Sequence, residues 1–372
     1  MSRERVVITG VGTVNAAVTG DSRVLGAFLA EPRGAIGDGD HGLRAAWLPS
    51  GVPAGFLDEQ SVRRLSRVSQ LAMVAARLAL AESGYDARAG LGLVVGSELG
   101  DLRSTIEFVD GYAQRGPAGL SALLFPNTVM NTMAATTAIA VGSRELSLTL
   151  NAPGVAGELA VARATAAVAA GRVAAVLAGG VDEHALPVAR ALAELAGHDL
   201  RGEGATFLLL ESLMSARRRG AAVLGEVRGT AWRALRAQPH GIGRGLTSRA
   251  VPAALADADI SADAVGWVYD SASGDAARDS WERAVVSRAL GRRLPGTSLH
   301  GVLGHHSGLG TLRVAAAAWT ARSRRLPQAP DSAAGGEQGG AYRPSPVEGS
   351  AGLVHALARG GAEVALVVTE PA

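Results

Sequence analysis

Two kinds of residue are missing from this chain of 372 residues. It contains no cysteine, and its 36 basic side chains are all arginines, because no lysine occurs in the sequence. Without cysteine there is no thiolate nucleophile, no disulfide and no cysteine-ligated zinc or iron–sulfur centre. Without lysine there is no Schiff-base lysine, no pyridoxal anchor and no lysine of a phosphate-binding loop. Arginine replaces neither residue, since it stays protonated and is a poor base or nucleophile.

Aromatic residues and net charge are also scarce. Only 4% of the residues are aromatic while 48% are hydrophobic, so we expect a large core of alanine, valine and leucine. The formal charge of +2 is too small for a strong attraction to nucleic acid, and the arginines are scattered among acids. No apolar stretch reaches the roughly 18 residues of a membrane-spanning helix. The apolar stretch at the N-terminus is too short for a signal peptide. We therefore expect a cytoplasmic protein that binds neither nucleic acid nor membranes.

Short apolar runs alternate with helical segments along the chain, which is typical of a parallel sheet covered by helices on both faces. The length favours two α/β halves, residues 1–220 and 221–372, that meet near Gly220 without a visible sequence repeat. Residues 326–350 are rich in proline, glycine and serine and predict a surface segment. The expected strands are Arg5–Thr9, Leu91–Gly96, Ser147–Leu150, Val173–Ala178, Ala205–Glu211, Val223–Gly229, Val265–Tyr269 and Ala362–Thr369. The expected helices are Ser61–Ser83, Asn127–Val141, Pro153–Ala170, Ser280–Leu290 and Thr311–Arg322.

Two short motifs have competing interpretations. Gly10 and Gly12 follow the first strand as in a dinucleotide-binding loop, but the third glycine and the later acidic residue of that motif are missing. A tight strand-to-loop turn is the better interpretation. His305 and His306 lie in a glycine-rich turn and suit either acid–base chemistry or a structural role. The chain has no G-x-S-x-G nucleophile elbow and no H-E-x-x-H zinc motif, and we expect no cofactor and no metal site.

Three segments carry more information than these motifs. Phe125–Asn131 (FPNTVMN), Ser147–Gly157 (SLTLNAPGVAG) and Ala170–Gly180 (AGRVAAVLAGG) resemble successive motifs of the β-ketoacyl synthase family. The opening RVVITGVGTVN, the sequence GEGA at Gly202–Ala205 and the later TFLLLE and ARRRGA resemble other parts of that family. The resemblance covers nearly the whole chain. It implies an α/β thiolase-like fold in five layers, αβαβα, with two pseudo-duplicated halves.

The resemblance also locates the family's nucleophile and its gating loop. In active members a cysteine stands at the N-terminus of a buried helix, where the helix dipole helps to ionise the thiol. That position is Gly154 here. The gating loop, which is GFGG in the family, corresponds to Ala358–Gly361 and has lost its phenylalanine.

The other catalytic positions are also altered, with one exception. The first catalytic histidine, aligned through Asp279 and Glu282, falls on Ser271. The family's lysine falls on His300, and its second histidine is retained as His305. The resemblance therefore implies that the chain alone has no ketosynthase activity and acts as a subunit of a β-ketoacyl synthase complex.

Inactive members of this family are best known as chain-length factors, the ketosynthase β subunits of type II polyketide synthases. They form a heterodimer with a catalytic ketosynthase, and the heterodimer extends acyl chains on an acyl carrier protein. The resemblance places the Asn127–Val141 helix and the preceding loop at the dimer interface. The side chains whose bulk would limit the acyl tunnel are Leu124, Phe125, Val129, Met130 and Met133, with Thr105 and Val109 on the preceding element. Each of them also has the simpler interpretation of packing in a dimer core.

The product class and two further functions stay open at this point. Gly154 departs from the glutamine that aromatic-polyketide chain-length factors usually carry there, and the stretch from Leu186 to Gly202 is short. Both features favour a reducing system that makes a polyene or other linear acyl chain in antibiotic biosynthesis. One alternative is an acyltransferase or hydrolase that uses Ser271 with His305. The other is a scaffold that binds acyl carrier protein and has no ketosynthase partner.

Overall fold

An eleven-stranded mixed β-sheet forms the centre of the computed structural model, which describes residues 4–38, 44–49, 51–196, 200–328 and 343–371. Its strand order is β12-β11-β15-β16-β10-β1-β9-β7-β5-β6, with β2 paired to β1. The strands are β1 (Val6–Asn15), β2 (Thr19–Gly20), β5 (Leu91–Ser97), β6 (Ser147–Asn151), β7 (Ala175–Asp182), β9 (Gly204–Ser212), β10 (Gly225–Ala234), β11 (Val265–Tyr269), β12 (Gly296–Thr297), β15 (Ala351–Leu357) and β16 (Ala362–Thr369). Two small sheets join β3 (Gly37–Asp38), β4 (Arg44–Ala46) and β8 (Arg201–Gly202), and β13 (Arg325–Leu326) with β14 (Ser345–Pro346).

The same strand pattern occurs twice. In the first half β6, β5 and β7 are parallel neighbours, and β9 and β1 continue the sheet in antiparallel pairs. In the second half β12, β11 and β15 are parallel, and β16 and β10 continue it in antiparallel pairs. The halves join where β1 pairs with β10. The expectation of a wholly parallel sheet is therefore wrong, because strands buried on both faces are continuous apolar runs whatever the direction of their neighbours.

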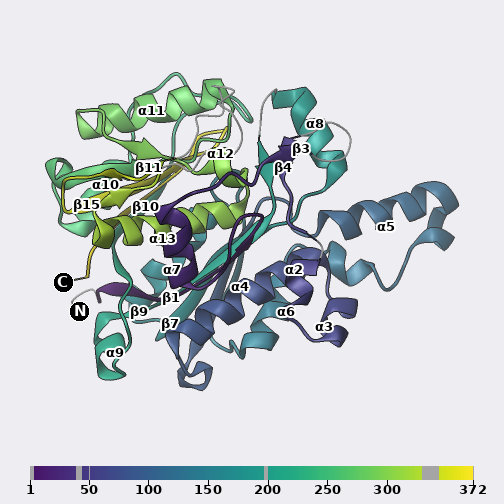
Figure 1. Ribbon diagram of the computed structural model, residues 1–372. Coiled ribbons are helices and arrows are strands. Elements are labelled where there is room, and N and C mark those ends of the chain that lie inside the picture. The colour runs from purple at the N-terminus through teal and green to yellow at the C-terminus, as the bar shows by residue number, and fades with distance from the viewer. Residues whose placement is uncertain (1–3, 39–43, 50, 197–199, 329–342, 372) are drawn as a thin grey trace.

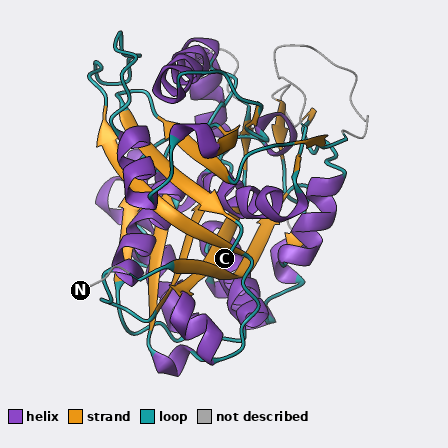
Figure 2. Cartoon of the chain, turned by 90° about the vertical axis from the view of Figure 1, so that its left-hand side faces the viewer, coloured by secondary structure: helices purple, strands orange, loops and turns teal. Residues whose placement is uncertain are grey.

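Helices form three layers around the two halves of the sheet (Figure 1). The central helices, α7 (Ala156–Ala169) and α13 (Ser307–Ser323), carry mostly small apolar residues on all sides and are buried between the halves, as expected for helices without a polar face. Figure 2 shows strands enclosed by helices on both sides. None of the helices in the described ranges is both long and apolar enough to cross a membrane. The central layer is α7 (Ala156–Ala169) and α13 (Ser307–Ser323), one outer layer contains α4 (Arg67–Ser83) and α6 (Thr132–Val141), and the other contains α10 (Ala250–Ala258) and α11 (Ala276–Leu290).

Two predicted helices are interrupted near their starts. The segment Ser61–Ser83 divides at Leu65, whose extended backbone (φ −91°, ψ 138°) ends one helix before α4 begins. The segment Asn127–Val141 is helical only from Thr132, because a 3₁₀ turn at Phe125–Thr128 (η4) is followed by extended backbone at Val129. The remaining helices are α1 (Ser22–Ala30), α2 (Gly51–Ala54), α3 (Glu59–Arg64), α5 (Leu102–Arg115), α8 (Leu186–Ala196), α9 (Leu213–Arg218) and α12 (His300–Leu303).

Gly10 and Gly12 lie inside β1, so the predicted strand-to-loop turn is wrong. A Cβ at Gly10 would lie 2.1 Å from the carbonyl oxygen of Ala79, and one at Gly12 would lie 2.0 Å from that of Ala75. Both carbonyls belong to α4. The two glycines therefore allow α4 to pack directly on the backbone of β1.

Candidate functional site

Gly154 lies two residues before α7, where the chain turns from β6 into that helix. Its φ of +77° is in the left-handed region that glycine adopts at little cost. A Cβ at this position would lie 3.2 Å from the Cβ of Ala358, in the turn between β15 and β16. The position aligned with the family's nucleophile therefore lies against the turn aligned with its gating loop, but it has no side chain that could carry an acyl group.

Ser271 follows β11 and is fully buried. Its hydroxyl donates to the Glu282 carboxylate, with Oε1 at 2.9 Å, and accepts from Arg278 Nη2 at 2.6 Å and from the Leu357 backbone N–H at 3.0 Å. A serine hydroxyl has one proton and two lone pairs, and these contacts use all three. The Ser271 oxygen has no lone pair left for attack on a substrate.

The contacts of Ser271 belong to a larger buried network that includes His355 of β15 and Glu363 of β16. His355 Nδ1 lies 2.8 Å from Glu282 Oε1, and His355 Nε2 lies 3.1 Å from Glu363 Oε1. Burial opposes the charge on His355, but hydrogen bonds to the two carboxylates outweigh it and raise the pKa of His355 to about 9. Burial also opposes the charge on Glu282, but Arg278 and His355 lower the pKa of Glu282 to about 2. The network is therefore a set of opposite charges that stabilise one another in the interior.

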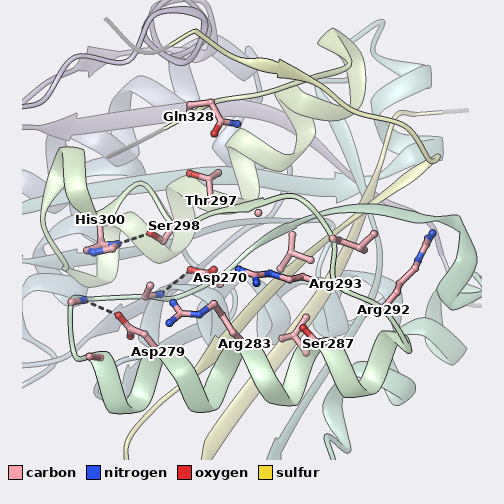
Figure 3. A pocket seen from close by; sticks show the side chains of 17 residues that line it. Asp270, Asp279, Arg283, Ser287, Arg292, Arg293, Thr297, Ser298, His300 and Gln328 are labelled. Carbon is pink, nitrogen blue, oxygen red and sulfur yellow. Dashed lines mark hydrogen bonds between the residues drawn. The ribbon is translucent and has the colours of Figure 1, made fainter. Parts of the chain in front are cut away.

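His300 begins α12 and lines a cavity of about 380 Å³ (Figure 3). Its Nδ1 lies 2.5 Å from the Ser298 hydroxyl, and burial together with nearby arginines lowers the pKa of His300 to about 3. Asp270, on the same cavity, accepts from the Ala272 backbone N–H, and burial raises the pKa of Asp270 to about 6. The position aligned with the family's lysine therefore holds a neutral imidazole near pH 7.

His305 is buried beside a different group of residues. Its backbone N–H donates to the Leu200 carbonyl at 2.6 Å, and its Nε2 lies 4.0 Å from Glu98 Oε2. Burial and the neighbouring Arg201 hold the pKa of His305 well below its usual value. Within the described residues no hydrogen bond joins His305 to Ser271. The structure therefore does not assemble these two side chains into a nucleophile–base pair.

The residues aligned with the tunnel and dimer interface gather on α5, η4 and α6, and Figure 1 shows α5 projecting from the body of the molecule. Val109 of α5 is 55% exposed and Phe125 of η4 is 58% exposed, while Thr105 and Leu124 are half-buried. Met133 differs from the others: it is 2% exposed and packs in the core beneath α6.

Beside this surface runs β6, the last strand of the sheet. Its partner on one side is β5, and a groove of about 390 Å³ lies along it, lined in part by Val129, Met130 and Leu148. An edge strand presents unpaired backbone groups and is a template for pairing with another chain.

Comparisons with known proteins identify the family of this chain. Residues 53–201 match the family model described as "Beta-ketoacyl synthase, N-terminal domain". The chain is 31% identical over 300 residues, 70% of each protein, to "Putative polyketide beta-ketoacyl synthase 1" of Streptomyces virginiae. It is 30% identical over 364 residues, 85% of each protein, to the protein of the same name from Streptomyces halstedii. The chain belongs to the β-ketoacyl synthase family. The family resemblance inferred from the sequence is thereby confirmed.

Solved structures confirm the thiolase-like ketosynthase fold. "The ishigamide ketosynthase/chain length factor" superposes with a TM-score of 0.86 at 21% identity and full coverage of both chains. A complex described as "AntDE:AntF (apo): type II PKS acyl-carrier protein in complex with its ketosynthase bound to the hexaketide" gives 0.83 at 18% identity, again over both whole chains. In this member of the family the sequence motifs located Ser271 and Glu282, but the charge network around them was missed. The sequence analysis did not predict the strand that contains His355. It assigned no role to Arg278, which lies between Ser271 and Glu282 in the sequence.

Proposed function

We propose that this chain is the non-catalytic chain-length factor of a type II polyketide synthase, paired with a catalytic ketosynthase subunit. The observation that carries the proposal is Gly154. Chain elongation by a ketosynthase requires an acyl group held on a nucleophile, and Gly154, two residues before α7, has no side chain. No cysteine elsewhere in the sequence replaces it.

The remaining catalytic positions support the same conclusion. Decarboxylation of a malonyl unit needs donors that stabilise the developing negative charge. Ser271 already uses its hydroxyl in the interior network, and His300 is neutral near pH 7. The contacts of Ser271 also weigh against an acyltransferase or hydrolase in which Ser271 acts with His305.

The surface around β6 supports a protein partner. Exposed apolar side chains cluster on the elements beside this edge strand, including Leu123, which is 89% exposed, and Ile139, which is 83% exposed. Exposed apolar side chains gathered on neighbouring elements indicate a protein interface. One solved structure of the same fold is described as a ketosynthase/chain length factor and another as an acyl carrier protein with its ketosynthase. We therefore propose a ketosynthase and an acyl carrier protein as partners.

The proposed role is steric. Val129 and Met130 line the groove along β6, so their bulk would stand at the end of a tunnel entering from the partner subunit. The product we favour is a polyene or other linear acyl chain, because Gly154 replaces the glutamine typical of aromatic-polyketide factors.

The proposal is tested by co-expressing this chain with a ketosynthase from the same organism. That ketosynthase should be one that contains the catalytic cysteine, both histidines and the lysine. We expect a stable 1:1 complex by light scattering. Leu123→Asp and Ile139→Asp should each abolish it, because they place a charge on the apolar surface. The matched control is Met214→Asp, at a 57% exposed methionine on α9, which should leave the complex intact. A stable homodimer that ignores the ketosynthase would contradict the proposal.

A further inference from the structure

The cavity of about 380 Å³ that His300 lines lies at the carboxyl ends of two parallel strands (Figure 3). Asp270 directly follows β11, Ser298 directly follows β12, and both residues line the cavity. Helix α11 forms another wall, on which Asp279 and Arg283 lie one turn apart. Open α/β sheets bind their ligands outside the carboxyl ends of the strands, and the volume suits a small organic molecule.

Two arginines of this cavity have no acidic partner. Within the described residues the Arg283 guanidinium donates to the Ser280 hydroxyl, at 3.2 Å, and the Arg293 side chain forms no hydrogen bond or ion pair. Figure 3 shows both guanidinium groups turned towards Asp270, one from α11 and the other from the segment after it, whereas Arg292 points away. Arg283 and Arg293 therefore present unused donors to the same space.

The two carboxylates of the cavity differ in their partners. Asp279 forms an ion pair with Arg278, with Nη1 and Oδ1 3.2 Å apart, and accepts from two backbone N–H groups. Asp270 accepts only from the Ala272 backbone N–H, at 3.1 Å, and forms no ion pair in the described part of the chain. The cavity is also lined by three arginines, and His300 is neutral near pH 7. Positive charge therefore exceeds negative charge by two around this cavity.

This excess of positive charge matches a phosphate monoester. Such a group is a dianion above its second pKa of about 6, and its three free oxygens can accept from two guanidinium groups at once. A carboxylate has a single charge and is satisfied by one arginine. The cavity is also lined by Val268, Val286 and Leu294, which supply apolar surface for the rest of the molecule.

We propose that this cavity binds a small organic phosphate monoester, with the phosphate held by Arg283 and Arg293 and the apolar part against Val286 and Leu294. The site is separate from the proposed tunnel and does not depend on the chain-length function. Asp270 opposes such a ligand through its own negative charge. Substitutions of the arginines and of Asp270 should therefore change the affinity in opposite directions.

Binding of butyl phosphate to the full chain at pH 8 tests this site. We expect saturable binding in ligand-observed NMR of the butyl protons. Butanesulfonate has the same alkyl group and three oxygens but only one negative charge, and it should bind about tenfold more weakly. Inorganic phosphate should compete about tenfold less well than butyl phosphate, because it has no apolar part to bury.

The arginine variants locate the phosphate. Arg283→Gln and Arg293→Gln should each weaken the binding of butyl phosphate about tenfold, because each removes a charged hydrogen-bond donor. The matched control is Arg288→Gln, at an exposed arginine of α11 outside the cavity, and it should leave the affinity unchanged.

Asp270→Asn should strengthen the binding about threefold or more, because it removes a negative charge while its amide oxygen still accepts from the Ala272 N–H. Asp259→Asn, outside the cavity, is its control and should not change the affinity. The proposal is overturned if butyl phosphate shows no saturable binding, or if butanesulfonate or inorganic phosphate binds as tightly. Unchanged affinity in both Arg283→Gln and Arg293→Gln, or weaker binding by Asp270→Asn, would overturn it as well.

Discussion

The Arg278 guanidinium and the Glu282 carboxylate lie 2.7 Å apart in the interior, one turn from each other on α11, and both hydrogen-bond to the Ser271 hydroxyl. This ion pair encloses the residue aligned with the family's first catalytic histidine. The residue that the family resemblance aligns with that histidine is here part of the structural core.

Removing one member of this pair should strongly destabilise the protein. Arg278→Met leaves the Glu282 carboxylate without its guanidinium partner, and breaking a buried ion pair in this way costs about 3–5 kcal/mol. Urea unfolding followed by circular dichroism measures the loss. The double variant Arg278→Met/Glu282→Gln should recover part of it, because no unpaired charge of this pair remains. A single variant as stable as the parent would show that the pair contributes nothing.

The network should also give the stability a distinct pH dependence. Its two carboxylates raise the pKa of His355 from 6.5 to about 9. The stabilisation of the folded state by protonated His355 is therefore complete below pH 6.5 and is lost as the pH rises through 9. The pKa of Glu282 falls from 4.5 to about 2, so its contribution is complete above pH 4.5 and is lost as the pH falls towards 2. Thermal unfolding from pH 6 to pH 10, with NMR titration of the His355 ring, measures the alkaline side. Glu282→Gln should lower the pKa of His355, and an unchanged titration would refute the coupling.

Introducing a cysteine at position 154 should not produce ketosynthase activity. Gly154→Cys would contain the chain's sole thiol, so alkylation by iodoacetamide is readily followed by intact mass. We expect the thiol to be labelled but no condensation of acyl and malonyl groups on acyl carrier protein, because Ser271 and His300 remain. The left-handed backbone should cost about 1–2 kcal/mol of stability, and Gly154→Ala should show the same cost without a thiol. Condensation by the cysteine variant would contradict the assignment of the other positions.

Enlarging a side chain beside β6 should shorten the product of the proposed heterodimer. Val129→Trp adds bulk in the groove next to this edge strand, and we expect the longest acyl chain on the carrier protein to lose one or more extension units. Intact-mass spectrometry of the carrier protein measures the change. Val24→Trp on α1, at a similarly exposed valine outside the groove, is the matched control and should leave the products unchanged. Unchanged products from Val129→Trp would remove this residue from the tunnel.

The local pattern predicted the isolated apolar strands best. Val265–Tyr269 and Ala362–Thr369 have the predicted bounds, because each combines valines with other apolar residues and is bordered by polar or small residues. The strand Ala351–Leu357 was missed, since it contains alanine, glycine and a histidine whose burial depends on Glu282 and Glu363 from elsewhere in the chain. Helix α5 was also missed, because it projects from the body and buries little apolar surface.

The amino-acid sequence alone determined that this protein contains no cysteine and no lysine, and the family resemblance read from it aligns Gly154 with the nucleophile. It also determined the family, because the order of motifs along a chain is a property of the sequence. Only the tertiary structure decided the state of the remaining polar residues. Whether the Ser271 oxygen has a free lone pair and whether His300 is charged depend on burial and on groups distant in sequence. Those contacts exist only once the two halves of the sheet have closed around α7 and α13.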